Sequence, residues 1–344
     1  MTANSEPVLP LPPKTKVRRY LFLLVVLGLG LYLLLPQFAH IQHAFQVAST
    51  LKVTFVALSS GAQILSYLGS GYLLRAVVRG VGKPVSIVEG ALVTAGANSV
   101  GTLGGGMLGT AGMTYLWLRQ RGVNSGAAGL GGWIPIYLNN AMLAIVSLLG
   151  LLTLLLLNKF SIMLVAAFAL AVLILGGGLG ALVWSLTHRE KLTPLAVAIA
   201  GFIAKFRRKA MDRHAIQLAA ERLLAAWDDL LQGGWQGPVT GAAMNIGFDM
   251  FTLALLFFAA GHGVGVLVLV AGYGVPQLLG KLTVILGGVG VVETTMVALY
   301  GALGVPAAIG VVVVLVYRLF SFWIPTLAGI ALVPYLEHRK DGAD

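Results

Sequence analysis

Between Leu230 and Leu336 the chain carries only four Asp, Glu, Lys or Arg residues, and all of them lie in stretches too apolar to face water. These four residues are Asp249, Lys281, Glu293 and Arg318. A charged side chain at the centre of a bilayer costs at least about 2.5 to 3.5 kcal/mol, so such residues usually line a polar pathway or pair with one another. The pattern therefore predicts either a polar chamber for a charged head group or two buried ion pairs that only hold the fold together.

Helical rise predicts that the four charges converge near the middle of the membrane. In the chamber interpretation, Lys281 and Arg318 hold the phosphate of a lipid head group. Asp249 and Glu293 then balance these cations, select cationic head groups or exchange protons.

A glycine-rich break comes just before one of these carboxylates. Gly287, Gly288 and Gly290 precede an apolar arm at 291–303, whose first backbone N–H groups are expected to point toward the membrane centre. A helix N-terminus attracts anions through its free donors and its dipole, so we predict that these glycines contribute to the phosphate site. The alternative is that Glu293 caps its own helix and the glycines only permit tight packing.

Uncharged polar residues are predicted to line the rest of the chamber. They are Gln63, Asn98, Asn139, Asn140 and Asn245. Gln63 belongs to a stripe with Ser59, Ser66 and Ser70, and polar stripes in membrane helices more often join helices than form a pathway.

Composition defines the class of protein. Hydrophobic residues make up 58% of the chain and charged residues 10%, against about 25% charged residues in soluble domains, so the sequence predicts an all-α polytopic membrane protein. The net charge is +11, and all but four of the 23 Lys and Arg residues lie in clusters between apolar segments. This is the positive-inside pattern, which predicts that both termini of a multi-pass protein lie in the cytoplasm. We expect its location to be the bacterial cytoplasmic (inner) membrane. Anionic lipid explains the basic surface, and nucleic acid is not needed.

Catalytic, metal and cofactor sites are not predicted. The chain contains no cysteine, which excludes disulfides and thiolate sites, and its two neighbouring histidines, His40 and His43, are too few for a metal centre. The sequence contains no Walker loop, GxSxG or HExxH motif. We therefore expect a protein without enzymatic activity and without a cofactor.

Apolar segments of about 20 residues predict about six spanning helices and two re-entrant hairpins. The spans are expected at 20–36, 53–78, 124–157, 161–186, 236–260 and 305–336, and the hairpins at 85–119 and 264–303. The first span has a less favoured alternative as a signal peptide. The predicted parts are a cytoplasmic basic tail (1–19), an N-terminal membrane half (20–191), a cytoplasmic amphipathic linker (192–233), a C-terminal membrane half (234–337) and a cytoplasmic tail (338–344).

The two halves have the same order of elements in opposite orientation. A span, a glycine-broken hairpin and a long proline-containing helix occur at 53–157 and recur at 236–336. A shift of 182 residues superposes Gly122 on Gly304 and Gln63 on Asn245. We predict an inverted-topology repeat with oppositely oriented hairpins, an architecture in which substrate sites lie near the midplane.

Several motifs carry a family resemblance that covers roughly residues 15–337. They are Leu286-Gly-Gly-Val-Gly-Val-Val-Glu293, Gly304-Val305, Tyr317-Arg318 and Phe322-Trp-Ile-Pro325, with weaker matches at Asn98 and its following glycines and at Gly122-Val-Asn-Ser125. The chain resembles the flippase-like transmembrane domain of lysylphosphatidylglycerol synthases and its stand-alone YbhN-like and AglD-like relatives. After Lys340 only four residues remain, so no soluble synthase domain is expected. The first hairpin lacks charged residues that many relatives carry.

The resemblance implies a flippase or transporter that moves an aminoacylated phospholipid or another phosphate-bearing lipid, for example a polyprenyl-linked one, between leaflets of the cytoplasmic membrane. Two alternatives remain from the residues themselves. One is a non-catalytic membrane partner of a lipid-modifying or glycosyltransferase complex, and the other is a small-anion transporter. The expected partners are membrane lipids, and also a second copy in a homodimer or a synthase.

Overall fold

The computed structural model describes residues 46–79, 85–102, 106–157, 162–188, 234–282 and 286–338, together with a few helical residues between 190 and 228. The predicted first span at 20–36, the tail at 1–19 and most of the linker at 192–233 lie outside the described residues. Regular structure in the described part is helical throughout. The elements are α3 (Val53–Val77), α4 (Ile87–Val100), α5 (Gly106–Gln120), α6 (Ser125–Leu156), α7 (Ile162–Thr187), α10 (Gln236–Ala259), α11 (Val266–Leu282), η3 (Leu286–Gly288), α12 (Val291–Ala302), α13 (Ala307–Arg318), the π-helical η4 (Leu319–Trp323) and α14 (Ile324–His338).

Length and apolar composition identify this as an all-α membrane protein. Three of the described helical segments are long and apolar enough to cross a bilayer, namely Ser125–Leu156, Gln236–Ala259 and Ala307–Leu332. α3 is also 25 residues long, but it carries a stripe of serines and a glutamine. Three shorter apolar helices, Ile87–Val100, Val266–Lys281 and Val291–Ala302, belong to the two hairpins. The total of about six spans stays a prediction.

The helix boundaries repeat along the chain with the spacing found in the sequence. A shift of 182 residues carries the last residues of α3, α4 and α5 onto those of α10, α11 and α12, and it carries both ends of α6 onto the ends of the α13–α14 segment. The turns before α6 and α13 contain glycines at equivalent positions, Gly122 and Gly304, with φ of 79° and 92°. Only glycine adopts such φ values without steric cost, so both halves use the same device to begin their long helix.

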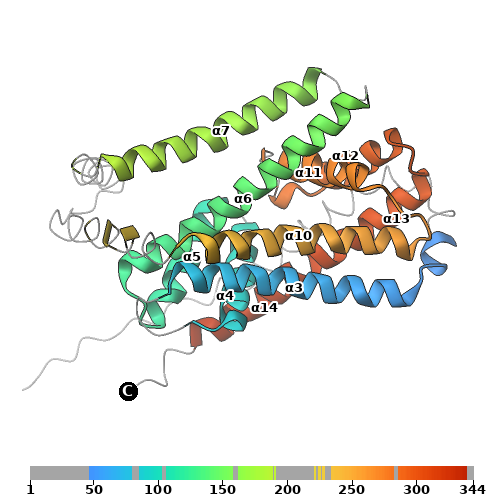
Figure 1. Cartoon of the computed structure of the whole chain (residues 1–344). Helices are drawn as coiled ribbons and strands as arrows, with labels where there is room; N and C mark the ends of the chain where they lie inside the picture. The colour runs from blue at the N-terminus through green and yellow to red at the C-terminus, as the bar shows by residue number, and fades with distance from the viewer. Residues whose placement is uncertain are drawn as a thin grey trace, which may run out of the picture. The chain divides into compact units, whose positions relative to one another are not determined.

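The two repeats are inverted relative to each other. α3 and α10 occupy equivalent positions in the repeats and pack side by side in opposite directions (Figure 1). The direction follows from the bonds between them: Ser66 Oγ donates to the Asn245 carbonyl (2.8 Å), whereas Thr252 Oγ1 lies near the Ser59 carbonyl (3.4 Å). The predicted polar stripe on the second span thus joins two helices.

Each hairpin also packs against the long helix of the other repeat. α4 contacts α14, and α11 contacts α6. At the second contact, Ser147 Oγ donates to the Gly274 carbonyl at 2.8 Å. At the first, the backbone beside Gly329 lies against Ala95 and Ser99. Because each hairpin packs against the long helix of the other repeat, a space is left between the two repeats.

Close approach of α3 and α10 depends on Gly241. A Cβ atom at this position would lie 2.6 Å from the Leu73 backbone N and Cα atoms. We expect Gly241→Ala to lower the free energy of unfolding by about 1–3 kcal/mol, because two backbones would have to separate. Gly247→Ala on the same helix is the control, since nothing lies within 4 Å of a Cβ there. Thermal unfolding in detergent measures both variants, and equal midpoints would contradict the prediction.

Candidate functional site

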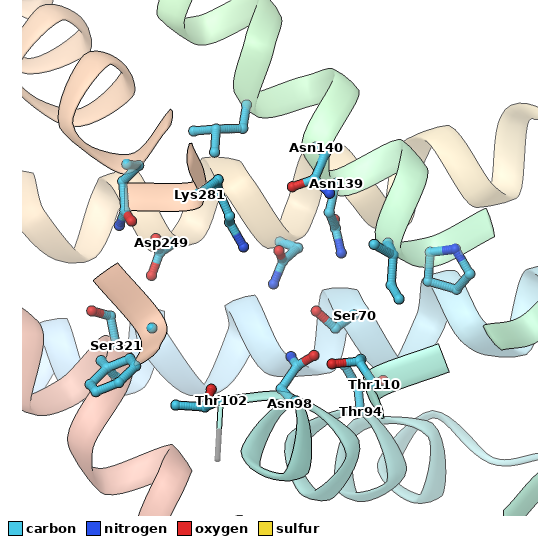
Figure 2. Close-up of a pocket in the computed structure, with 18 of the residues that line it drawn as sticks. Ser70, Thr94, Asn98, Thr102, Thr110, Asn139, Asn140, Asp249, Lys281 and Ser321 are labelled. Atoms are coloured by element: carbon cyan, nitrogen blue, oxygen red, sulfur yellow. The ribbon is translucent and has the colours of Figure 1, made fainter. Parts of the chain in front are cut away.

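A polar cavity of about 530 Å³ lies where the two repeats meet. Its walls come from α3, α4, α5, α6, α10, α11, η3 and the α13–α14 segment, so both hairpins and both long helices contribute. Ten of the predicted site residues line it: Gln63, Asn98, Asn139, Asn140, Asn245, Asp249, Lys281, Gly287, Gly288 and Arg318. The predicted site residues Gly290 and Glu293 do not line it. Figure 2 shows side chains from several helices converging on this space.

Asp249 is held by neutral donors rather than by a cation. Its Oδ1 accepts a hydrogen bond from Gln63 Nε2 (3.0 Å), and its Oδ2 accepts from the hydroxyls of Tyr273 (2.8 Å) and Tyr317 (2.7 Å). Gln277 Nε2 donates in turn to the Tyr317 hydroxyl at 2.7 Å. The carboxylate therefore connects α3, α10, α11 and α13. In the described residues it forms no ion pair, so the alternative interpretation of two structural ion pairs does not apply to Asp249.

Arg318 and Glu293 form a buried ion pair. Arg318 Nε donates to Glu293 Oε1 at 2.5 Å, and the two residues are 4% and 2% exposed. Glu293 Oε2 accepts from the backbone N–H of Gly290 at 2.6 Å. Glu293 thus caps its own helix, as the alternative interpretation proposed, and it also neutralises the arginine. Glu293 balances the charge of Arg318, as predicted, but Glu293 itself does not line the cavity.

The guanidinium of Arg318 is held in place by two more contacts. Nη2 donates to the Gly287 carbonyl at 3.4 Å, and the Phe322 ring lies 4.3 Å from Cζ. Phe322 belongs to the π-helical turn η4 that directly follows Arg318, a type of turn that is frequent at functional sites. A Cβ on Gly287 would collide with this ring, and the residue has φ of 62°. Glycine is therefore required there both for its conformation and for its size.

Lys281 is the cation without a carboxylate partner. Within the described part of the chain no carboxylate forms an ion pair with it. Its side chain is exposed to the cavity that it lines, and Figure 2 shows it pointing into the space opposite the first hairpin. An unpaired ammonium in a cavity enclosed by apolar helices is a strong binding group for an anion.

Three asparagines of the first repeat line the cavity with side-chain amides that have no hydrogen-bond partner among the described residues. The side chains of Asn98, Asn139 and Asn140 form no hydrogen bond with other described residues, and Asn139 Oδ1 is buried. Gln63 Oε1 and Ser321 Oγ are also buried without a partner. Buried polar groups are normally hydrogen-bonded, so the buried atoms Gln63 Oε1, Asn139 Oδ1 and Ser321 Oγ indicate a ligand or ordered water in the cavity.

The sequence analysis did not predict three residues that contribute to the site: Tyr273 and Gln277 on α11, and Tyr317 on α13. Tyr273 and Gln277 share one face of α11 with the predicted Lys281, at intervals of four residues. A polar side chain at every fourth position of an apolar helix is a signal that could have identified Tyr273 and Gln277. Tyr317 stood beside Arg318 in the motif, but only the fold shows that its hydroxyl reaches Asp249.

We expect Tyr317→Phe to lower the free energy of unfolding by about 1–3 kcal/mol, because Asp249 and Gln277 would each lose a hydrogen-bond partner in a buried setting. Tyr300→Phe is the matched control. Tyr300 is equally buried, but its hydroxyl makes only a 3.3 Å bond to the Leu269 carbonyl. Chemical or thermal unfolding of both variants in detergent gives the comparison, and a larger loss for Tyr300→Phe would contradict the role assigned to the network.

Comparison with known proteins places this arrangement in a family. The model of the lysylphosphatidylglycerol synthase TM region matches residues 21–329. A UPF0104 membrane protein of Methanocaldococcus jannaschii is 26% identical over 163 residues, which are 46% of this chain and 48% of the relative. A second, from Pyrococcus horikoshii, is 49% identical over 59 residues (17% of each chain), and a third, from Methanothermobacter thermautotrophicus, is 30% identical over 87 residues (25% of this chain and 26% of the relative). The chain thus spans half or less of the length of these relatives. Because the family model matches most of the chain, the protein belongs to the family of lysylphosphatidylglycerol synthase transmembrane regions.

Proposed function

We propose that this protein moves a phosphate-bearing lipid between the two leaflets of the cytoplasmic membrane. The observation that carries the proposal is the polar cavity between the inverted repeats, which presents the unpaired Lys281 and the guanidinium of Arg318. The family's description, which refers to a synthase of a modified phospholipid, supports a lipid as the substrate. The cavity volume of about 530 Å³ is sufficient for a phospholipid head group but not for its acyl chains.

In this proposal the phosphate lies between Lys281 and Arg318. The ammonium provides a point charge, and the guanidinium provides N–H donors that Glu293 and Phe322 hold in place. The carbonyl of Gly287 positions the arginine, while the absence of side chains at Gly287 and Gly288 leaves room for the Phe322 ring and the Gly280 backbone that pack there. Asp249 joins α3, α10, α11 and α13 and transmits a change in one repeat to the other.

Transport then follows from the inverted repeat. Rocking of one hairpin against the long helix of the other repeat would expose the cavity to each leaflet in turn, while the acyl chains stay in lipid. No covalent bond of the lipid changes in this cycle, so the protein acts as a transporter and not as an enzyme. We further propose that both termini face the cytoplasm.

A small-anion transporter is a second candidate, because an unpaired lysine would bind free phosphate by the same chemistry. A partner role beside a synthase or a glycosyltransferase, or a homodimer, is compatible with the same cavity. The experiment below separates lipid transport from anion transport and from a role without transport.

The test is reconstitution of the purified protein in liposomes that contain phospholipids labelled on an acyl chain. Exposure of the label to an external quencher reports movement between leaflets, and uptake of labelled inorganic phosphate is measured in the same vesicles. The proposal expects lipid movement well above that in protein-free vesicles, without phosphate uptake. Phosphate uptake without lipid movement would indicate an anion transporter, and neither activity would refute both transport functions.

A further inference from the structure

The two ends of the cavity differ in chemistry. The charged residues that line it are Asp249, Lys281 and Arg318. Figure 2 shows Asp249, Lys281 and Ser321 toward one end of the pocket. Toward the other end it shows Ser70, Thr94, Asn98, Thr110, Asn139 and Asn140, all of them uncharged. A head group whose phosphate lies at the charged end would place the rest of its structure among hydroxyls and amides.

Side-chain amides match a particular kind of ligand. Each amide offers both N–H donors and a carbonyl acceptor, as a hydroxyl group offers both a donor and acceptors. Asn98, Asn139 and Asn140 have no hydrogen-bond partner among the described residues, and Asn139 Oδ1 is buried. A phosphate would satisfy only the donors, and an ammonium would satisfy only the acceptors. A group with several hydroxyls would satisfy both.

Among the described residues of the lining, the amide end offers no carboxylate to a cationic head group. Glu293 is paired with Arg318 and lies behind the wall. Asp249 accepts hydrogen bonds from Gln63, Tyr273 and Tyr317 and lies at the charged end beside the proposed phosphate position. Within the described lining, the amide end therefore contains no anionic group to neutralise an ammonium, and its amide and hydroxyl oxygens would compensate the desolvation of that charge only in part.

We propose that the ligand of this cavity is a phosphate joined to an uncharged polyhydroxyl group, such as glycerol or a sugar, and not an aminoacylated or choline head group. This inference rests on the proposed function and names the head group of its lipid. The phosphate binds at Lys281 and Arg318, and the hydroxyls bind at Asn98, Asn139 and Asn140.

The test compares three acyl-labelled lipids in proteoliposomes: phosphatidylglycerol, phosphatidylcholine and lysylphosphatidylglycerol. We expect phosphatidylglycerol to move about tenfold faster than the other two, which is the effect of one to two additional hydrogen bonds. In the double variant Asn98→Leu with Asn139→Leu, this ratio should fall toward one. Thr187→Val, at the exposed end of α7 outside the cavity, is the control and should keep the ratio.

A second measurement does not depend on the stability of the variants. Soluble glycerol 3-phosphate should compete with phosphatidylglycerol transport by the wild-type protein, and phosphocholine should compete at least about tenfold less well. Uptake of labelled glycerol 3-phosphate without lipid movement would support the polyhydroxyl chemistry while overturning the lipid proposal. Equal or faster transport of lysylphosphatidylglycerol would overturn the head-group assignment while leaving lipid transport intact.

Discussion

Replacing Arg318 with methionine is expected to lower the free energy of unfolding by about 3–5 kcal/mol, because Glu293 would remain as an uncompensated charge in a buried site. Glu293 is 2% exposed, its second oxygen accepts from the Gly290 N–H group, and Arg318 is the described side chain that donates to its first oxygen. Unfolding in detergent, followed by circular dichroism or by an intrinsic fluorescence signal, measures the loss. Lipid transport by this variant should be absent.

The double variant Arg318→Met with Glu293→Met separates stability from function. Replacement of both partners by apolar side chains of similar length is often neutral or stabilising, so the double variant should unfold within about 1 kcal/mol of the wild-type protein. Its transport should still be absent, because Arg318 lines the cavity. Recovery of transport along with stability would show that the pair only holds the fold together.

Lys281→Gln is expected to reduce lipid transport by about 10- to 100-fold without loss of stability. A hydrogen bond to a charged group contributes about 1.5–3 kcal/mol, and each 1.4 kcal/mol corresponds to a factor of ten. Lys281 has no carboxylate partner among the described residues, and its side chain is exposed to the cavity. Removing its charge therefore breaks no ion pair. Initial rates with phosphatidylglycerol, together with unfolding midpoints, give both quantities.

Lys281→Arg is the matched control for this substitution. It keeps the positive charge, so it should retain more activity than Lys281→Gln, although the planar guanidinium changes the geometry. A loss of stability in Lys281→Gln as large as that in Arg318→Met would contradict the binding role and would assign Lys281 to the fold. Full transport activity in Lys281→Gln would remove the lysine from the phosphate site.

Much of the fold follows from hydropathy and glycine placement. Apolar length and the breaks between segments predicted the described helices with boundaries that differ by a few residues from the observed ones, such as 53–78 against Val53–Val77. The interruption before Glu293 appears as glycines with positive φ at 287, 288 and 290. These features depend on local backbone preferences and on burial in lipid, which act along the chain and can be recognised from sequence.

The partners of the charged residues could not be predicted in the same way. Asp249 and Gln63 are 186 positions apart, and their bond depends on the register of two antiparallel helices. The glycine and serine contacts between α3 and α10 determine this register. The hydroxyl of Tyr317 reaches Asp249 only because α13 packs beside α10.

By itself the sequence determined that this is an all-α membrane protein with a twofold internal pattern, and it identified ten residues that line one cavity. Hydropathy, the positions of charged clusters and the spacing of glycines are properties of the linear sequence, so they can be recognised without coordinates. Only the tertiary structure decided which charges are neutralised and which remain available. Arg318 and Glu293 pair, neutral donors surround Asp249, and Lys281 has no carboxylate partner among the described residues, because the crossing of the inverted repeats determines which side chains meet in the interior.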